Sequence, residues 1–114
     1  MNCLFCRIIK GEIPSTKVFE NDKVVAFHDI HPKAPVHLLV IHKEHTPSIT
    51  ETPHEKSYIF GDIFDAVREI ALQLKLDEKG YRIIVNNGKA AGQEVFHLHI
   101  HILGGVDSLG TMLA

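Results

Sequence analysis

The chain has 114 residues, of which 45% are hydrophobic and 23% are charged, and its formal net charge at pH 7 is −2. This composition is typical of a globular protein with a true core, and we expect residues 1–114 to form a single domain. The slight negative charge argues against a nucleic-acid-binding protein, which would normally carry a basic face. No apolar stretch is long enough to span a bilayer and no signal-peptide pattern opens the chain, so we expect a cytoplasmic protein without membrane partners.

The only two cysteines, Cys3 and Cys6, form a Cys-x-x-Cys pair near the N-terminus. Without a secretion signal, such a pair is more typical of a metal or redox site than of a structural disulfide. A thioredoxin-like pair would follow a first strand, at the start of a helix within a βαβ unit, and this pair does not. By itself the pair leaves open both a metal site and two reduced, buried thiols.

The first part of the chain predicts one short helix and three strands. Residues 4–10 place apolar side chains at helical spacing, and Gly11 is a plausible end. Residues 17–20 and 23–28 predict two antiparallel strands joined by a turn at residues 21–22. A proline-punctuated loop at 29–35 precedes a largely buried strand over 36–41. His37 enters this strand among apolar residues, a setting more typical of a hydrogen-bonded core residue than of a catalyst.

The middle of the chain predicts a long amphipathic helix and a further strand. Over residues 54–76, apolar side chains recur at steps of three and four, namely Ile59, Ile63, Val67, Ile70 and Leu74. Gly80 is the expected end of this helical segment, and residues 81–86 predict the fourth strand. The loop at 87–93 contains glycines, so its backbone amides can face an anion, although a simple hairpin connection explains it equally well.

Three histidines alternate with apolar residues in the segment 97–102. In a strand, His97, His99 and His101 lie on one face, roughly 6.8 Å apart in succession, while the alternate residues Leu98, Ile100 and Ile102 cover a core. Three interpretations compete: a packed or solvated row of histidines, a metal site built on His-x-His, and nucleophilic catalysis by a neutral imidazole whose neighbours handle protons and phosphate charge.

This segment, with the motifs around it, resembles the histidine triad family of nucleotide hydrolases and transferases. The likeness includes residues 8–14, residues 26–37, Asn86, the Gly92-Gln93 pair and the Gly104-Gly105 pair, and it is greatest to the nucleoside phosphoramidase branch. The resemblance implies an α+β fold, with an antiparallel sheet of about five strands, one long and one short helix, and a homodimeric assembly.

The resemblance also implies an activity. The expected reaction is hydrolysis of purine nucleoside 5'-phosphoramidates, or related derivatives of nucleoside monophosphates such as AMP, through a nucleotidyl-histidine intermediate. One alternative is a nucleotide-binding regulatory or scaffold protein whose hydrolysis is incidental. A second alternative is a dinucleoside polyphosphate hydrolase.

In the family, the middle histidine of the triad attacks the α-phosphate, which implies that His99 is the nucleophile. His101 would contact phosphate oxygens, and His97 would support the nucleophile. His37 matches a histidine of the same hydrogen-bond network, which favours a catalytic role over its core interpretation. The nucleophile's other ring nitrogen needs a partner to define the tautomer, and a backbone carbonyl is the usual one.

The resemblance implies nucleotide contacts from two further segments. Asp29 matches the carboxylate that accepts the ribose hydroxyls, Ile30 lies beside it, and the base would be walled by Phe27, His28 and Ile13. The residues expected near the phosphate are Asn86, Gly92, Gln93 and Glu94. Many relatives carry serine in place of Glu94, and a carboxylate beside a phosphate is unfavourable unless it turns away or pairs with a cation. The leaving-group preference is therefore open.

Some bacterial members share the N-terminal Cys-x-x-Cys, which implies a zinc site made by Cys3, Cys6, His45 and His97. Two thiolates and two imidazoles make a closed tetrahedral set suited to structural zinc, which would join the N-terminal helix to the sheet. No metal is expected in the chemical step. In the tail, which lacks the tryptophan common in this branch, we expect three apolar side chains to pack at or across the dimer interface: Leu109, Met112 and Leu113.

Overall fold

The computed structural model describes residues 3–111. Its elements in chain order are α1 (Leu4–Ile9), β1 (Lys17–Glu20), β2 (Val24–His28), β3 (Val36–His42), the 3-10 turn η1 (His54–Lys56), α2 (Tyr58–Gln73), β4 (Arg82–Ile84), the 3-10 turn η2 (Lys89–Ala91) and β5 (His99–Gly104). All neighbouring strands are antiparallel, in the order β1-β2-β3-β5-β4. The predicted α+β class, the five strands and the two helices are confirmed.

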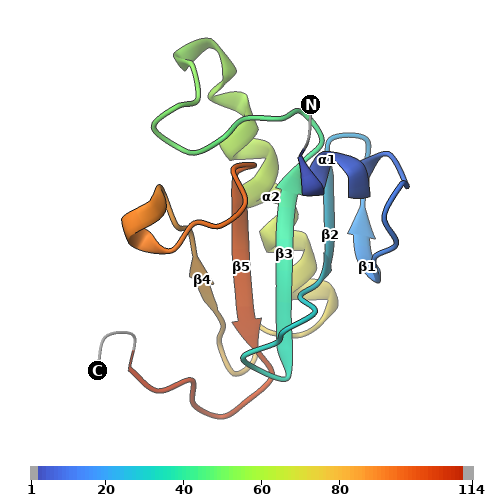
Figure 1. Cartoon of the computed structure of the whole chain (residues 1–114). Coiled ribbons are helices and arrows are strands. Elements are labelled where there is room, and N and C mark those ends of the chain that lie inside the picture. Colours follow the sequence, from blue (N-terminus) through green and yellow to red (C-terminus); the bar gives the residue numbers. More distant parts are fainter. Residues whose placement is uncertain (1–2, 112–114) are drawn as a thin grey trace.

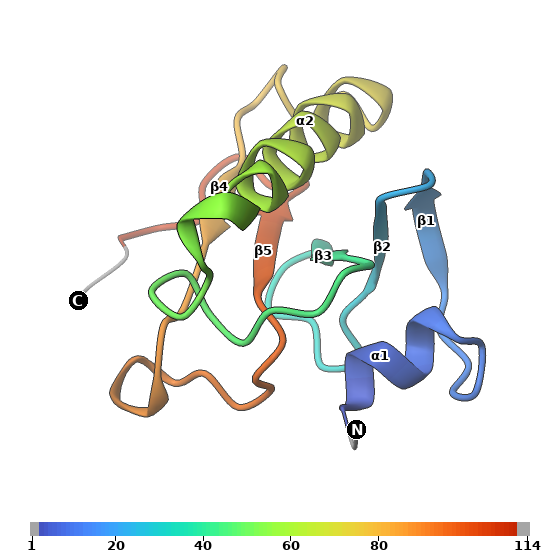
Figure 2. The same ribbon diagram turned by 90° about the horizontal axis from the view of Figure 1, so that it is seen from above.

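The two helices cover opposite faces of the sheet (Figures 1 and 2). Because successive side chains of a strand point to opposite faces, each central strand contributes to two cores. On one face, Leu38, Val40 and Ile102 pack with the apolar stripe of α2. On the other, Phe5 and Ile8 of α1 pack with a second set of strand residues, namely Val25, Phe27, Leu39 and Ile41. The short helix therefore covers only part of its face.

Strand β5 presents its histidines on the α1 face. His99 lies opposite Ile41 of β3, and His101 lies opposite Leu39. The alternate residues Leu98, Ile100 and Ile102 belong to the core under α2, as the sequence pattern predicts. The strand begins at His99, however, so His97 lies just before it. The backbone N–H of Leu98 donates to the carbonyl of Thr46 at 2.7 Å, which takes this residue out of the sheet ladder.

Several predicted boundaries differ from the structure at the ends of elements. The turn before β2 extends to residue 23, because the side-chain oxygen of Asn21 accepts the N–H groups of both Lys23 and Val24. The long helical segment is divided into η1 and α2, and α2 ends at Gln73 rather than near Gly80. Lys75 adopts a left-handed conformation with φ of 57°, which prevents further helix. Within residues 3–111, no helix has the length and hydropathy that a membrane-spanning segment requires.

Candidate functional site

His99 is a buried imidazole whose tautomer is determined by the backbone. Its Nδ1–H group donates to the carbonyl oxygen of His97 at 2.8 Å, which leaves the lone pair on Nε2. The ring of Phe5 packs edge-on against it, with ring centroids 5.1 Å apart, so α1 shields one side of the imidazole. Burial lowers the pKa of His99, which keeps the ring neutral near pH 7. A neutral imidazole with a free Nε2 lone pair is a nucleophile.

His37 and His101 form a hydrogen-bonded pair next to His99. The backbone N–H of Lys33 donates to Nδ1 of His37 at 3.0 Å, so the proton of this neutral ring is on Nε2. Nε2 of His37 lies 3.0 Å from Nδ1 of His101, and its N–H donates to that nitrogen. The proton of His101 is consequently on its own Nε2, which becomes a donor for a substrate oxygen. Burial lowers the pKa of His37, and lowers that of His101 to about 4, which is consistent with two neutral rings.

Asp29 lies beside this pair. Its Oδ2 is 3.4 Å from Nε2 of His37, and its Oδ1 accepts the backbone N–H of His31 at 2.8 Å. Asp29, His37 and His101 are close enough together to suggest a second metal site. The hydrogen-bond directions favour a different interpretation, because Nε2 of His37 carries a proton and has no lone pair for a metal. The group is best described as a hydrogen-bond network that orients His101.

The other predicted nucleotide residues come from the end of β2, from the loops that follow β2 and β4, and from the segment between α1 and β1, and they differ in accessibility. His28 and Ile30 are exposed beside Asp29, and Ile13 is half-buried. Phe27 instead lies in the core against Phe5, with ring centroids 5.7 Å apart, so it offers little surface to a base. The structure thus places a short exposed segment after β2, rather than a complete wall, next to the histidines.

The loop between β4 and β5 is held by Gln93, which is 4% exposed. Its Oε1 accepts the N–H of Gly88, and its Nε2 donates to the carbonyls of Pro47 and Val95. Because the whole amide group is engaged, this side chain supports the loop rather than reaching toward a phosphate. Gly92 and Glu94 on either side are exposed, and Asn86 is half-buried at the start of the loop.

The four predicted zinc ligands, from three separate segments, do come together. Nδ1 of His97 lies 3.5 Å from Sγ of Cys3, 3.6 Å from Sγ of Cys6 and 3.1 Å from Nδ1 of His45. The fourth distance, from Sγ of Cys6 to Nδ1 of His45, is 3.4 Å. A zinc tetrahedron with ordinary bond lengths has edges of roughly 3.3 Å between nitrogens and 3.5 Å between nitrogen and sulfur. The donor set therefore fits zinc in both chemistry and spacing.

His97 connects this cluster to His99. Its Nε2–H donates to the carbonyl of His42 at 2.8 Å, so its Nδ1 lone pair faces the cysteines and His45. Burial lowers the pKa of His97 to about 4, which keeps the ring neutral and able to act as a ligand. Its own carbonyl accepts the Nδ1–H of His99. His97 thus contacts the cluster through its side chain and His99 through its backbone.

The sequence reasoning did not include two residues behind this arrangement, His42 and Asp62. His42 follows Leu38 and Val40 at alternate positions of β3, so it points into the core under α2. A polar side chain at such a position needs a partner. Asp62, directly before Ile63 of the buried helical stripe, supplies one at 2.9 Å. This juxtaposition was detectable in principle from the two periodicities.

Comparisons with known proteins show similarity over nearly the whole chain. A HIT domain model matches residues 10–108. HitA of Neisseria gonorrhoeae is 46% identical over 90% of this chain and 95% of that protein. The purine nucleoside phosphoramidase of Escherichia coli K12 is 42% identical over 97% of this chain and 92% of that protein. A solved structure of a histidine triad protein from Clostridium difficile has a TM-score of 0.92 and 45% identity, with 97% of this chain and 96% of that chain covered.

Proposed function

The chain belongs to the HIT-domain family, and from that premise we propose that it hydrolyses purine nucleoside 5'-phosphoramidates through a covalent intermediate on His99. The main support for this proposal is the tautomer of His99. Its Nδ1–H donates to the carbonyl of His97, so the lone pair on Nε2 is free to attack. The similarity to a purine nucleoside phosphoramidase over nearly the whole chain supports the substrate class.

The proposed reaction has two steps. In the first, Nε2 of His99 attacks the α-phosphorus and the phosphorus–nitrogen bond breaks, so that the amine leaves with the electron pair and takes up a proton from solvent. In the second, the oxygen of a water molecule bonds to phosphorus as the bond to Nε2 breaks; the water gives up a proton to solvent, and the nucleoside monophosphate and the neutral imidazole are released. The Nε2–H of His101, oriented by His37, donates to a phosphate oxygen as charge develops. Asp29 accepts the ribose hydroxyls.

We further propose a structural zinc on Cys3, Cys6, His45 and His97. The fit of the four donor atoms to tetrahedral edges supports this assignment. A closed set of four protein ligands leaves no position for substrate, so the ion would stabilise the fold and take no part in the reaction. It would join α1, the segment after β3 and the segment before β5.

A homodimer built on the edge of the sheet is the proposed assembly. Strand β4 is an edge strand, and Ile83 on it is 36% exposed. Next to it, an apolar cavity of about 250 Å³ continues onto α2, where Phe64 is 49% exposed. An exposed edge can pair with the same edge of a second copy around a twofold axis. Phe64→Glu should then produce a monomer by light scattering, whereas Leu72→Glu, at an exposed position outside the cavity lining, should not.

The function is tested by trapping the intermediate. Wild-type protein mixed with substrate labelled at the α-phosphorus should, on alkaline quenching, retain label that acid later releases, and His99→Ala should retain none. Turnover should be highest for purine phosphoramidates within a panel that includes nucleotidyl sulfates and dinucleoside polyphosphates. Faster turnover of dinucleoside polyphosphates would change the substrate class. Negligible turnover of every member, with tight nucleoside monophosphate binding, would favour the regulatory alternative.

A further inference from the structure

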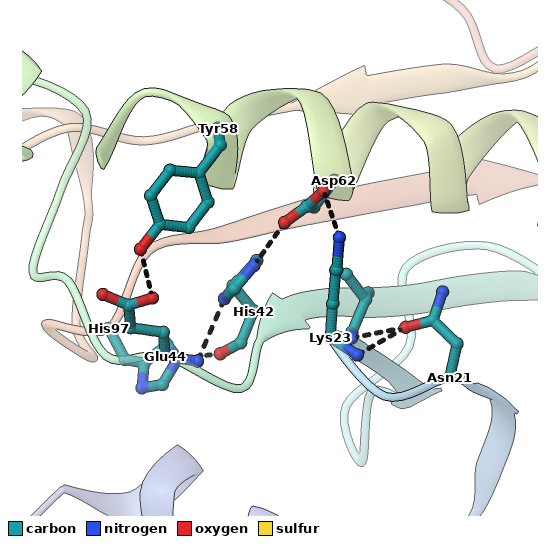
Figure 3. Close-up of polar contacts among 8 residues, drawn as sticks. Asn21, Lys23, His42, Glu44, Tyr58, Asp62 and His97 are labelled. Atoms are coloured by element: carbon teal, nitrogen blue, oxygen red, sulfur yellow. Dashed lines mark hydrogen bonds and ion pairs between the residues drawn. The ribbon is translucent and has the colours of Figure 1, made fainter. Parts of the chain in front are cut away.

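His42 and Asp62 face each other on the α2 side of the sheet, and the proposed reaction uses neither. His42 is the last residue of β3 and is 5% exposed. Its Nε2–H donates to Oδ2 of Asp62, which lies near the start of α2, at 2.9 Å. Figure 3 shows the two side chains pointing toward each other between the strand and the helix. A carboxylate acceptor makes this a charge-assisted hydrogen bond, stronger than one between neutral groups.

The second ring nitrogen of His42 holds the turn that follows β3. The backbone N–H of Glu44 donates to Nδ1 of His42 at 3.0 Å. This turn leads directly to His45, one of the two imidazoles of the proposed zinc cluster. The hydroxyl of Tyr58 on α2 also donates to Oε1 of Glu44, at 2.6 Å, so the turn is attached to α2 at two points (Figure 3).

The backbone of His42 holds the other imidazole ligand. The ladder between β3 and β5 ends at the pair formed by Ile41 and His99, so the carbonyl of His42 lies beyond it. That carbonyl accepts the Nε2–H of His97 at 2.8 Å (Figure 3). This hydrogen bond decides which nitrogen of His97 carries the proton, and it directs the Nδ1 lone pair to the cysteines.

We propose that the His42–Asp62 pair is a positioning device for the metal cluster. Through its ring, His42 holds the turn that carries His45; through its carbonyl, it orients His97. The carboxylate of Asp62, on the opposite face of the sheet, holds His42 in place and thereby orients both imidazole ligands, His45 and His97. The inference rests on the proposed zinc site. Removing a group that hydrogen-bonds directly to a metal ligand typically lowers metal affinity by about 10- to 100-fold, and Asp62, which acts through His42, should contribute about tenfold.

The pair can be altered without opening a hole in the apolar core. It lines a cleft of about 450 Å³ together with charged and polar side chains, namely Asp22, Lys23, Lys43, Glu44 and Tyr58. Water can therefore occupy the space left by a smaller side chain. Asp65 provides a matched control, because it lies three residues further along α2, is 70% exposed and pairs only with Arg68 among the described residues.

The first measurement is zinc affinity, by competition with a chromogenic chelator, in reduced protein. Asp62→Ala should weaken binding by about tenfold relative to wild type, the lower end of the range for direct partners of ligands, because Asp62 acts through His42. Asp62→Asn, which keeps a neutral acceptor for the ring, should recover part of the loss. His42→Asn, whose amide oxygen replaces Nδ1 but cannot reach Asp62, should resemble Asp62→Ala. Asp65→Ala should remain at the wild-type value.

The second measurement reports on the hydrogen bond of His97 directly. In protein as purified, the Nε2–H proton of His97 should exchange slowly with solvent, and in Asp62→Ala it should exchange about tenfold faster or more. Unchanged zinc affinity in Asp62→Ala overturns the proposal, whether or not exchange changes. If wild-type protein binds no zinc, the zinc site fails and proton exchange alone decides whether the pair positions His97. If Asp62→Ala does not fold, Asp62→Asn and His42→Asn carry both measurements.

Discussion

The Nε2–H group of His37 and the Nδ1 atom of His101 lie 3.0 Å apart, although 64 residues separate them in the chain. Because His37 donates to Nδ1 of His101, the proton of His101 is on its Nε2. Replacing His37 with Phe keeps the ring and removes the donor. We expect kcat to fall by about tenfold or more, but by less than the 10²–10³-fold lost with an oxyanion donor itself. KM should change little, because Asp29 remains.

The control for this substitution is His31→Phe, made on the exposed loop that follows Asp29. Only the backbone N–H of His31 contacts Asp29, so the change of side chain should leave steady-state kinetics at the wild-type values. Equal kcat for His37→Phe and wild type would mean that the contact with His101 is structural packing alone.

The buried histidines predict how stability depends on pH. Burial lowers the pKa of His101 to about 4, whereas in the unfolded chain it is near 6.5. Between these values the unfolded state binds more protons, so the free energy of unfolding should decrease as the pH falls from 6.5 toward 4. His101→Gln lacks this titration, so its stability relative to wild type should improve over that range.

Urea denaturation of wild type and His101→Gln at pH 7.5 and pH 4.5 tests this prediction. The metal ligands are the same in both proteins, so their protonation cancels in the difference between the two curves. A difference that is constant with pH would show that His101 titrates normally in the folded protein.

Zinc removal should affect stability more than chemistry. Wild-type protein purified without added metal is expected to contain close to one zinc per chain. The double substitution Cys3→Ser with Cys6→Ser should lower Tm by more than about 10 °C, because metal binding contributes directly to folding free energy. The kcat of the folded fraction should change much less. Absence of zinc in fresh, reduced protein would exclude the site, and strong chelator inhibition without unfolding would indicate a catalytic metal.

The C-terminal tail is attached to the edge strand by Arg82. Its guanidinium donates to the carbonyls of Leu109 and Gly110, at 3.4 and 2.7 Å. If the tail influences leaving-group choice, Arg82→Met and deletion of residues 107–114 should shift kcat/KM between substrates with small and bulky amines in the same direction. Lys79→Met is the control, because its ion pair with Asp107 is exposed and therefore weak. An unchanged specificity profile in all three proteins would exclude a role for the tail.

The prediction that the tail packs across a dimer interface concerns three apolar residues, of which the structure describes Leu109. Leu109 is half-buried, in keeping with an apolar side chain that avoids water. Met112 and Leu113, to which the same prediction applies, lie outside the described residues. Light scattering on the deletion variant would show whether the tail contributes to assembly.

Periodicity by itself determined much of the fold. Alternation in the segment 97–102 assigned His99 and His101 to one face and Ile100 to the core, because the two-residue period of a strand is a local property. The stripe that includes Ile63 predicted the long helix for the corresponding reason. Resemblance to a family, rather than spacing, predicted that His99 is the nucleophile and that Cys3, Cys6, His45 and His97 hold zinc. Element ends were less predictable, since they depend on single contacts such as that between Leu98 and Thr46.

Only the tertiary structure decided how the histidines differ from one another. The sequence places His97, His99 and His101 in one row, but their tautomers follow from three different partners: the carbonyls of His42 and His97, which accept, and the Nε2–H group of His37, which donates. Two of these partners, His42 and His37, lie on β3, more than fifty residues away, and they reach the row only because β3 and β5 are neighbours in one register. The two-residue period of a strand determines which face of the sheet a side chain occupies. The groups that the side chain contacts there depend on strand order and register, which arise from packing of the whole chain.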